Sequence, residues 1–233
     1  MLFRSEGLWT GKKSGEWNDP GNWCREKIPT PDISVLIPGG TVFNPELNTA
    51  GFCDTLEILA GGKMLLKGLL QVRGNILAPS SSIHATNGSV VFNGSKAQTI
   101  LGSQFTNHTI GALQVQNNMG LSIQDSITVN QSISIQKGFI QTNNLLIIKE
   151  GAVVGPSAEG SRILGNVQVS KTVVSAKRQY IRHIQTKKNW LPELSPTLSI
   201  KINNIAIMTY LILKMPFMKL FWQWSRCRFC LPQ

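Results

Sequence analysis

The feature that most constrains the fold of this chain is a series of very short apolar runs separated by polar corners, which extends from about Cys53 to Lys171. The clearest example is Asn87–Gly102, where Val90-Val91-Phe92 and Ile100-Leu101 flank a corner that contains Asn93, Gly94 and Ser95. Glycine and asparagine tolerate positive φ, whereas β-branched residues favour extended backbone. The pattern therefore predicts many short strands joined by tight corners.

The strand lengths favour one all-β architecture over another. Apolar residues alternate with polar ones in runs of two to four, and no segment of this region has the pattern of a ten-residue amphipathic helix. Strands this short suit a right-handed parallel β-helix better than a β-sandwich, whose strands average five or six residues. At roughly 20–25 residues per repeat, residues 53–171 are expected to form about five turns.

Residues 1–50 are expected to be a tryptophan-rich N-terminal cap, ahead of a β-helical domain at 51–171. Trp9, Trp17 and Trp23 lie within fifteen residues, beside a turn at Asp19–Asn22. Flat aromatic faces could stack on sugars, so the three tryptophans are candidates for ligand contact. The favoured interpretation is that they cover the open end of the β-core and shield its edge.

The basic character of the chain is concentrated in residues 172–233. The chain has a net charge of +11, but residues 1–171 hold 13 Lys and Arg against 11 Asp and Glu, a net +2. The sequence therefore predicts no nucleic-acid binding by the main body. Residues 205–224 are apolar but contain Lys214, Pro216 and Lys219, so no membrane span is predicted. Residues 172–233 are expected to be a poorly ordered tail.

Sequence motifs for catalysis are sparse. The three histidines, His84, His108 and His183, have no Ser, Asp or Cys partner at a familiar spacing, and no HExxH, Walker or dinucleotide motif occurs. Glycoside hydrolysis needs two converging carboxylates, and Asp54 with Glu57 is one candidate pair. The sequence predicts no catalytic residue, metal ligand or cofactor. A carbohydrate-active β-helix enzyme, of the lyase or glycoside hydrolase type, is the alternative.

Several segments resemble the repeat regions of large adhesin-like surface proteins of Bacteroidetes, which are exported by type IX secretion. The resemblance covers about residues 8–181, and its most specific part is Val91–Gly94 together with Gln98–Ile100. The other matching segments are Trp9-Thr10-Gly11, Trp17, Asn22-Trp23, Pro29-Thr30, Ile37-Pro38-Gly39, Cys53, Leu56-Glu57-Ile58, Gly61, Gly165–Val169 and Ala176-Lys177-Arg178.

The resemblance implies a β-helical module of a secreted or cell-surface protein. Its expected role is structural or adhesive, with glycan or protein contacted through the flank of the β-helix. The N-terminal residues contain no apolar run of signal-peptide length, and the family's C-terminal sorting domain is not recognised. We therefore expect a truncated copy of such a protein.

Overall fold

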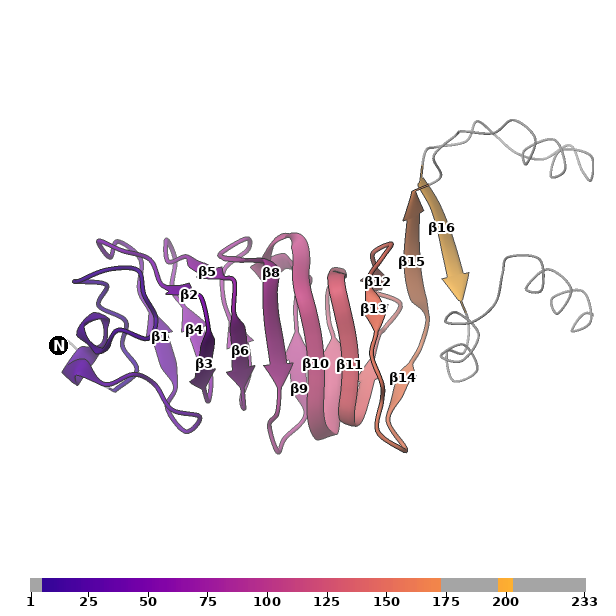
Figure 1. Cartoon of the computed structure of the whole chain (residues 1–233), viewed down its shortest axis with the longest axis horizontal. Helices are drawn as coiled ribbons and strands as arrows, with labels where there is room; N and C mark the ends of the chain where they lie inside the picture. Colours follow the sequence, from indigo (N-terminus) through magenta and orange to yellow (C-terminus); the bar gives the residue numbers. More distant parts are fainter. Residues whose placement is uncertain (1–5, 173–196, 203–233) are drawn as a thin grey trace, which may run out of the picture. The chain divides into compact units, whose positions relative to one another are not determined.

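The computed structural model describes residues 6–172 and 197–202. The fold is all-β, with about 51% of residues in strands and no α-helix in the part described. Parallel strands stack into a β-solenoid of about seven turns (Figure 1). The predicted parallel β-helix is therefore confirmed. No helix in the described ranges is long and apolar enough to span a membrane.

Each turn contributes short segments to three faces, which we call faces I, II and III. Face I contains β2 (Glu46–Leu47), β5 (Met64–Leu66), the first parts of β8 (Ile83–Phe92), β10 (Phe105–Ile123) and β11 (Ile127–Gln141), then β12 (Leu146–Ile148) and β15 (Val167–Thr172). Face II contains β3 (Ala50–Cys53), β6 (Leu69–Val72), the later parts of β8, β10 and β11, and β13 (Val153–Val154). Face III contains β1 (Val35–Ile37), β4 (Leu56–Ile58), β7 (Ile76–Leu77), β9 (Gln98–Ile100), the ends of β10 and β11, and β14 (Arg162–Leu164).

The core consists of aliphatic columns that run through successive turns. On face II, Cys53, Val72, Phe92 and Val115 are register partners, and each is fully buried. Alternate residues of a strand point to opposite sides of the sheet, so each period-two run sends one set of side chains inward. In-register parallel pairing then places the inward side chains of neighbouring turns one above another.

The solenoid begins earlier in the chain than the sequence predicts. β1 and β2 form part of its first turn and lie within residues 1–50, which were expected to be the cap and entry segment ahead of the β-helical domain. The residues ahead of them also join the stack, through parallel bridges from Leu8 to Leu36 and from Glu16 to Glu46. β2 has two residues, too few to produce a recognisable alternation. The cap and the solenoid therefore overlap.

The tail is described at one strand only. β16 (Thr197–Ile202) pairs with β15 in an antiparallel arrangement, unlike the parallel pairs of the other named strands in the described part. The expectation of a poorly ordered tail falls otherwise on residues outside the described ranges. His183 and the apolar stretch at 205–224 also lie outside them.

Face III has one break in its backbone ladder, between β7 and β9. Side-chain amides bridge the two segments there. Gln104 donates to the carbonyl oxygen of Ile76 at 2.9 Å, and the amide N–H of Thr99 donates to the side-chain oxygen of Asn75 at 2.9 Å. Gln98, which is buried, donates to the carbonyl oxygens of Val72, at 3.0 Å, and Gly74. These bonds take the place of the missing ladder and satisfy polar groups that burial would otherwise penalise.

Glycines stack at the corner between faces I and II. A Cβ added at Gly68 would lie 1.8 Å from the carbonyl oxygen of Thr49, and one added at Gly88 would lie 2.4 Å from that of Leu66. At Gly111 the same atom would lie 2.6 Å from the carbonyl oxygen of Gly88. These corners are glycine because consecutive turns approach each other too closely for any side chain.

Candidate functional site

All three tryptophans that the sequence proposes as ligand contacts are buried. Trp9 and Trp17 are 0% exposed and Trp23 is 2% exposed. The Trp23 ring packs edge-to-face on both others, with centroid separations of 4.9 Å to Trp9 and 4.7 Å to Trp17. A sugar-stacking platform needs an exposed ring face. The arrangement is instead that of a cap on the first turn, which was the favoured interpretation.

A buried asparagine holds the cap together. The Asn22 side-chain oxygen accepts hydrogen bonds from the backbone N–H groups of Lys13, at 3.0 Å, and Ser14, at 2.8 Å. Its amide nitrogen donates to the Ser14 hydroxyl and to the carbonyl oxygen of Glu16, both at 2.9 Å. All the polar atoms of this fully buried side chain therefore have partners.

The cap also fixes a loop on the surface. The Trp9 indole N–H donates to the carbonyl oxygen of Phe43 at 2.8 Å, and the Thr41 hydroxyl donates to the same oxygen at 3.0 Å. The backbone N–H of Phe43 donates to the carbonyl of Gly11. Phe43 itself is 43% exposed and the neighbouring Val42 is 79% exposed. The buried cap thus presents an aromatic ring on the outside of the first turn.

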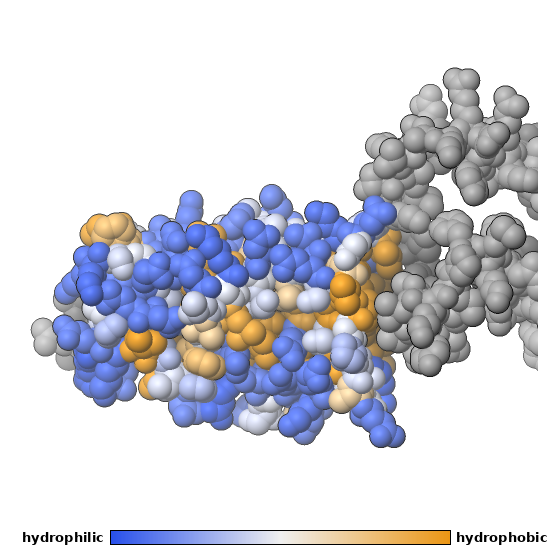
Figure 2. Space-filling view, viewed as in Figure 1, coloured by the Kyte–Doolittle hydropathy of each residue, from blue (hydrophilic) through white to orange (hydrophobic). Residues whose placement is uncertain are grey.

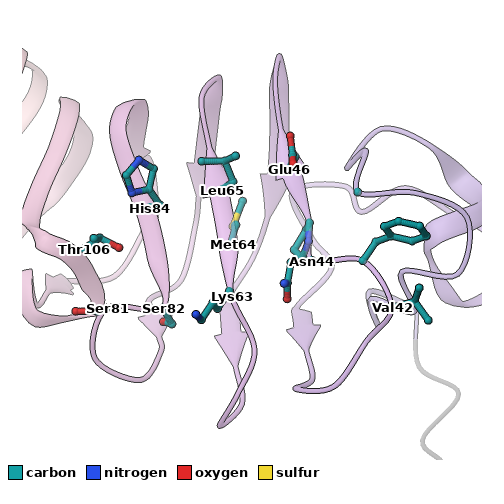
Figure 3. Close-up of a pocket in the computed structure, with 13 residues that line it drawn as sticks. Val42, Asn44, Glu46, Lys63, Met64, Leu65, Ser81, Ser82, His84 and Thr106 are labelled. Carbon is teal, nitrogen blue, oxygen red and sulfur yellow. The ribbon is translucent and has the colours of Figure 1, made fainter.

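Phe43 lines the larger of two hollows on face I, which we call the groove. The groove has a volume of about 610 Å³ and crosses β2, β5 and β8, with Glu46, Leu65 and His84 on neighbouring strands (Figure 3). Its surface combines an exposed aromatic ring with hydroxyl, amide and cationic groups. The lining residues are Gly15, Val42, Phe43, Asn44, Pro45, Glu46, Lys63, Met64, Leu65, Ser81, Ser82, His84 and Thr106.

The groove has one carboxylate among its lining residues, and that carboxylate is paired. Glu46 lies 3.3 Å from the ammonium group of Lys67. The Glu16 carboxylate, next to it in register, accepts from the side-chain amide of Asn48 at 2.9 and 3.1 Å. Lys63 lines the groove and has no ion-pair partner among the described residues. The groove is therefore better suited to a neutral or anionic ligand than to a cation.

A second hollow continues along the same face. It has a volume of about 410 Å³ and begins at Thr86 and Asn107, next to the groove residues His84 and Thr106. Thr109 and Thr128 are register partners in it, and Ile147 pairs with Thr128 on the next strand. Hydrophilic residues cover much of the viewed surface of the body, with apolar patches between them (Figure 2). The remaining lining residues of the second hollow are Asn130, Lys149 and Ser170.

One His–Asp contact is present that the sequence did not indicate. His108 Nδ1 lies 3.8 Å from Asp125 and 3.0 Å from the carbonyl oxygen of Ser126. A hydrogen bond from the Ser103 hydroxyl, together with backbone N–H groups, holds the pKa of Asp125 below its ordinary value. The serine bonds to the carboxylate rather than to the imidazole, so the order of contacts needed to activate a hydroxyl nucleophile is not formed.

The other candidates from the sequence do not converge. Asp54 contacts the hydroxyls of Ser34 and Thr55, and Glu57 is exposed on face III. Among the described residues, no group of three or more His, Cys, Asp and Glu is arranged to hold a metal ion. Cys53 is buried and unpaired, and burial raises the pKa of its thiol, so it packs in the core as a small apolar residue.

Sequence reasoning missed the residues that line the groove. Phe43 lies in an irregular loop, and nothing in its local pattern indicates that its ring is exposed. Leu65 and His84 are 19 residues apart and become neighbours only through the register of β5 and β8. No family model, curated protein or solved structure matches the chain.

Proposed function

We propose that the chain is a non-catalytic structural and adhesive module of a secreted or cell-surface protein, and that it contacts glycan through the groove on face I. The observation that carries this proposal is the composition of the groove. The groove is lined by the exposed ring of Phe43, the amide of Asn44, the hydroxyl of Ser81 and the imidazole of His84. Aromatic rings stack on the apolar faces of sugars, while such polar groups orient the sugar hydroxyls.

The scaffold supports an adhesive role for a physical reason. Each turn is bonded to its neighbours by backbone ladders, which hold the groove residues Glu46, Met64, Leu65, His84 and Thr106 in strands. The Trp9–Phe43 hydrogen bond fixes the irregular segment at residues 42–45 of the groove wall. A ligand can therefore bind with little ordering of the protein, which reduces the entropic cost of association.

The number of carboxylates that line the groove favours glycan binding over glycan hydrolysis. Glycosidases use two carboxyl groups across the scissile bond, roughly 5–10 Å apart. Glu46 is the carboxylate that lines the groove, and it pairs with Lys67. A carbohydrate-active enzyme remains the alternative, and Glu46 is its best candidate acid. A glycan-degrading reaction lost on Glu46→Gln substitution would favour that alternative.

The test is glycan binding by the whole chain and by two matched truncations of exposed apolar side chains. Phe43→Ala removes the groove aromatic, and Leu77→Ala removes a side chain that is 53% exposed on face III. We expect Phe43→Ala to weaken binding at least tenfold and Leu77→Ala to leave it unchanged, as measured by calorimetry with glycans selected on an array. Equal binding by both variants, or no glycan binding by the native chain, would overturn the proposal.

A further inference from the structure

The groove and the second hollow adjoin one another along face I, and we call the two together the track. His84 of the groove and Thr86 of the second hollow lie on the same side of β8, two residues apart. Likewise, Thr106 of β10 lines the groove, and the next residue, Asn107, lines the second hollow. The track runs across the strands, from turn to turn, rather than along any one strand.

Two lysines on this track have no acidic partner in the described part of the chain. Lys63 lies in the groove and Lys149 lies in the second hollow, and both are exposed. The nearest groove carboxylate, Glu46, is 3.3 Å from Lys67. An exposed lysine without an ion-pair partner does not destabilise the free protein, because its ammonium group stays hydrated. Its positive charge can attract an anionic ligand. The track therefore presents two separated positive charges on a polar floor of threonine, serine and asparagine.

The spacing of the two lysines defines the size of the ligand. Lys63 precedes β5 and Lys149 follows β12, and the strand order on face I places four strand-to-strand steps between β5 and β12. At about 4.8 Å per step, the two positions are about 19 Å apart along the stack axis. They are also offset along the strand direction, because Lys63 lies before β5 and Lys149 lies after β12. A mono- or disaccharide cannot reach both lysines. A linear chain that crosses the strands obliquely, from the start of β5 to the end of β12, can do so.

We propose that the ligand of this face is a linear anionic polysaccharide of the uronate type, bound along the track with its carboxylates near Lys63 and Lys149. This inference rests on the glycan-binding function proposed above and specifies the charge and length of the glycan. Charge complementarity across a polar interface sets specificity and orientation. The hydroxyls and amides between the two lysines supply hydrogen bonds to the sugars that separate the charged contacts.

The experiment compares two double variants of equal net charge. Lys63→Gln/Lys149→Gln removes both charges from the track. Lys96→Gln/Lys137→Gln removes two exposed lysines from the corner between faces II and III. The whole chain is titrated with polygalacturonate and with the same polymer fully methyl-esterified, at two ionic strengths. Equal net charge matters because residues 172–233 carry a net +9, which attracts any polyanion.

We expect the track variant to bind polygalacturonate at least tenfold more weakly than the native chain, and the corner variant to change less than twofold. Affinity should also rise with oligomer length until one oligomer spans both lysines. Equal losses in both variants, or no dependence on length, would overturn the inference. If the esterified polymer binds as well as the charged one and still requires Phe43, the glycan-binding function stands and the anionic specificity fails.

Discussion

The indole N–H of Trp9 donates a 2.8 Å hydrogen bond to the carbonyl oxygen of Phe43, which joins the buried cap to the rim of the groove. Trp9 is fully buried, whereas the ring of Phe43 is 43% exposed. The buried side chain of Trp9 therefore fixes the position of the partly exposed Phe43. Cap packing and the proposed ligand contact are coupled through the backbone of Phe43, whose N–H also donates to the carbonyl of Gly11.

Trp9→Phe tests this coupling. The substitution removes the indole donor and part of a packed ring, and we expect it to lower the free energy of unfolding by about 2 kcal/mol and to weaken glycan binding. Trp23→Phe is the matched control, because Trp23 is equally buried but donates to the carbonyl of Trp17 at 2.6 Å. Urea unfolding and calorimetry measure the two effects. Equal losses of binding in both variants would show that Trp9 has no special link to the groove.

Gly68→Ala tests the close contact of turns at the corner between faces I and II. The added Cβ would lie 1.8 Å from the carbonyl oxygen of Thr49, so the backbone must shift, and we expect a loss of about 3 kcal/mol. Gly40→Ala is the comparison, since it has no atom within 4 Å of the added Cβ but a φ of +75°. Its cost should be about 1 kcal/mol from backbone conformation alone. Equal midpoints in urea for both variants would contradict the packing argument.

Gln98→Leu tests the amide bridge on face III. Gln98 stands in an inward column with Leu121 and Ile140, so leucine fits the column in size and polarity. Its amide, however, bonds the carbonyl of Val72, and its oxygen accepts from the side chain of Asn117 at 2.8 Å. Leaving these buried groups unpaired should cost about 3 kcal/mol.

The control for Gln98→Leu is Gln124→Leu. Gln124 is exposed and bonds the Ser122 hydroxyl at 2.8 Å, so its replacement should change stability by less than about 0.5 kcal/mol. Chemical denaturation followed by circular dichroism gives both values. If Gln98→Leu proved neutral, the amide network would be dispensable and hydrophobic stacking would dominate this boundary.

Asp125→Asn tests the polar corner at Ser103 and His108. The pKa of Asp125 is depressed in the folded protein, first by the Ser103 hydroxyl and then by the N–H of Ser126. The carboxylate therefore stabilises the fold above the unfolded pKa, near 3.8, and this contribution is lost as pH falls through the folded pKa. The native chain should exceed the variant in stability at pH 7, and the difference should shrink below about pH 3.8. A difference that stays constant with pH would argue against the carboxylate charge.

The architecture was predictable because period-two alternation survives in strands as short as three residues. Val35 and Ile37, for example, alternate with their neighbours and form β1. The start of the solenoid was not predictable in the same way, since β2 has only two residues. The boundaries of the turns could not be predicted from a fixed repeat length either. β-Bulges between Ile110 and Ala112 and after Val115 change the number of residues per turn.

The candidate site was less predictable than the fold. The three tryptophans were recognisable in the sequence because they lie close together. Their spacing does not indicate whether each ring is buried or exposed. His108 and Asp125 are 17 residues apart, close to the length of one turn, and their contact depends on a left-handed backbone at Asn107 and His108. Such contacts come from register between turns, which a single sequence does not specify residue by residue.

The break between β7 and β9 has a mechanical consequence. Tension along the stack axis is carried by backbone ladders on all three faces where the first turn meets the second, at β1–β4, β2–β5 and β3–β6. Where β7 faces β9, ladders remain only on faces I and II, and the third face depends on Gln98, Gln104 and Asn75. Under tension along the stack axis, we expect the solenoid to yield first by bending open at this seam, on face III rather than on face I, where the proposed glycan site lies.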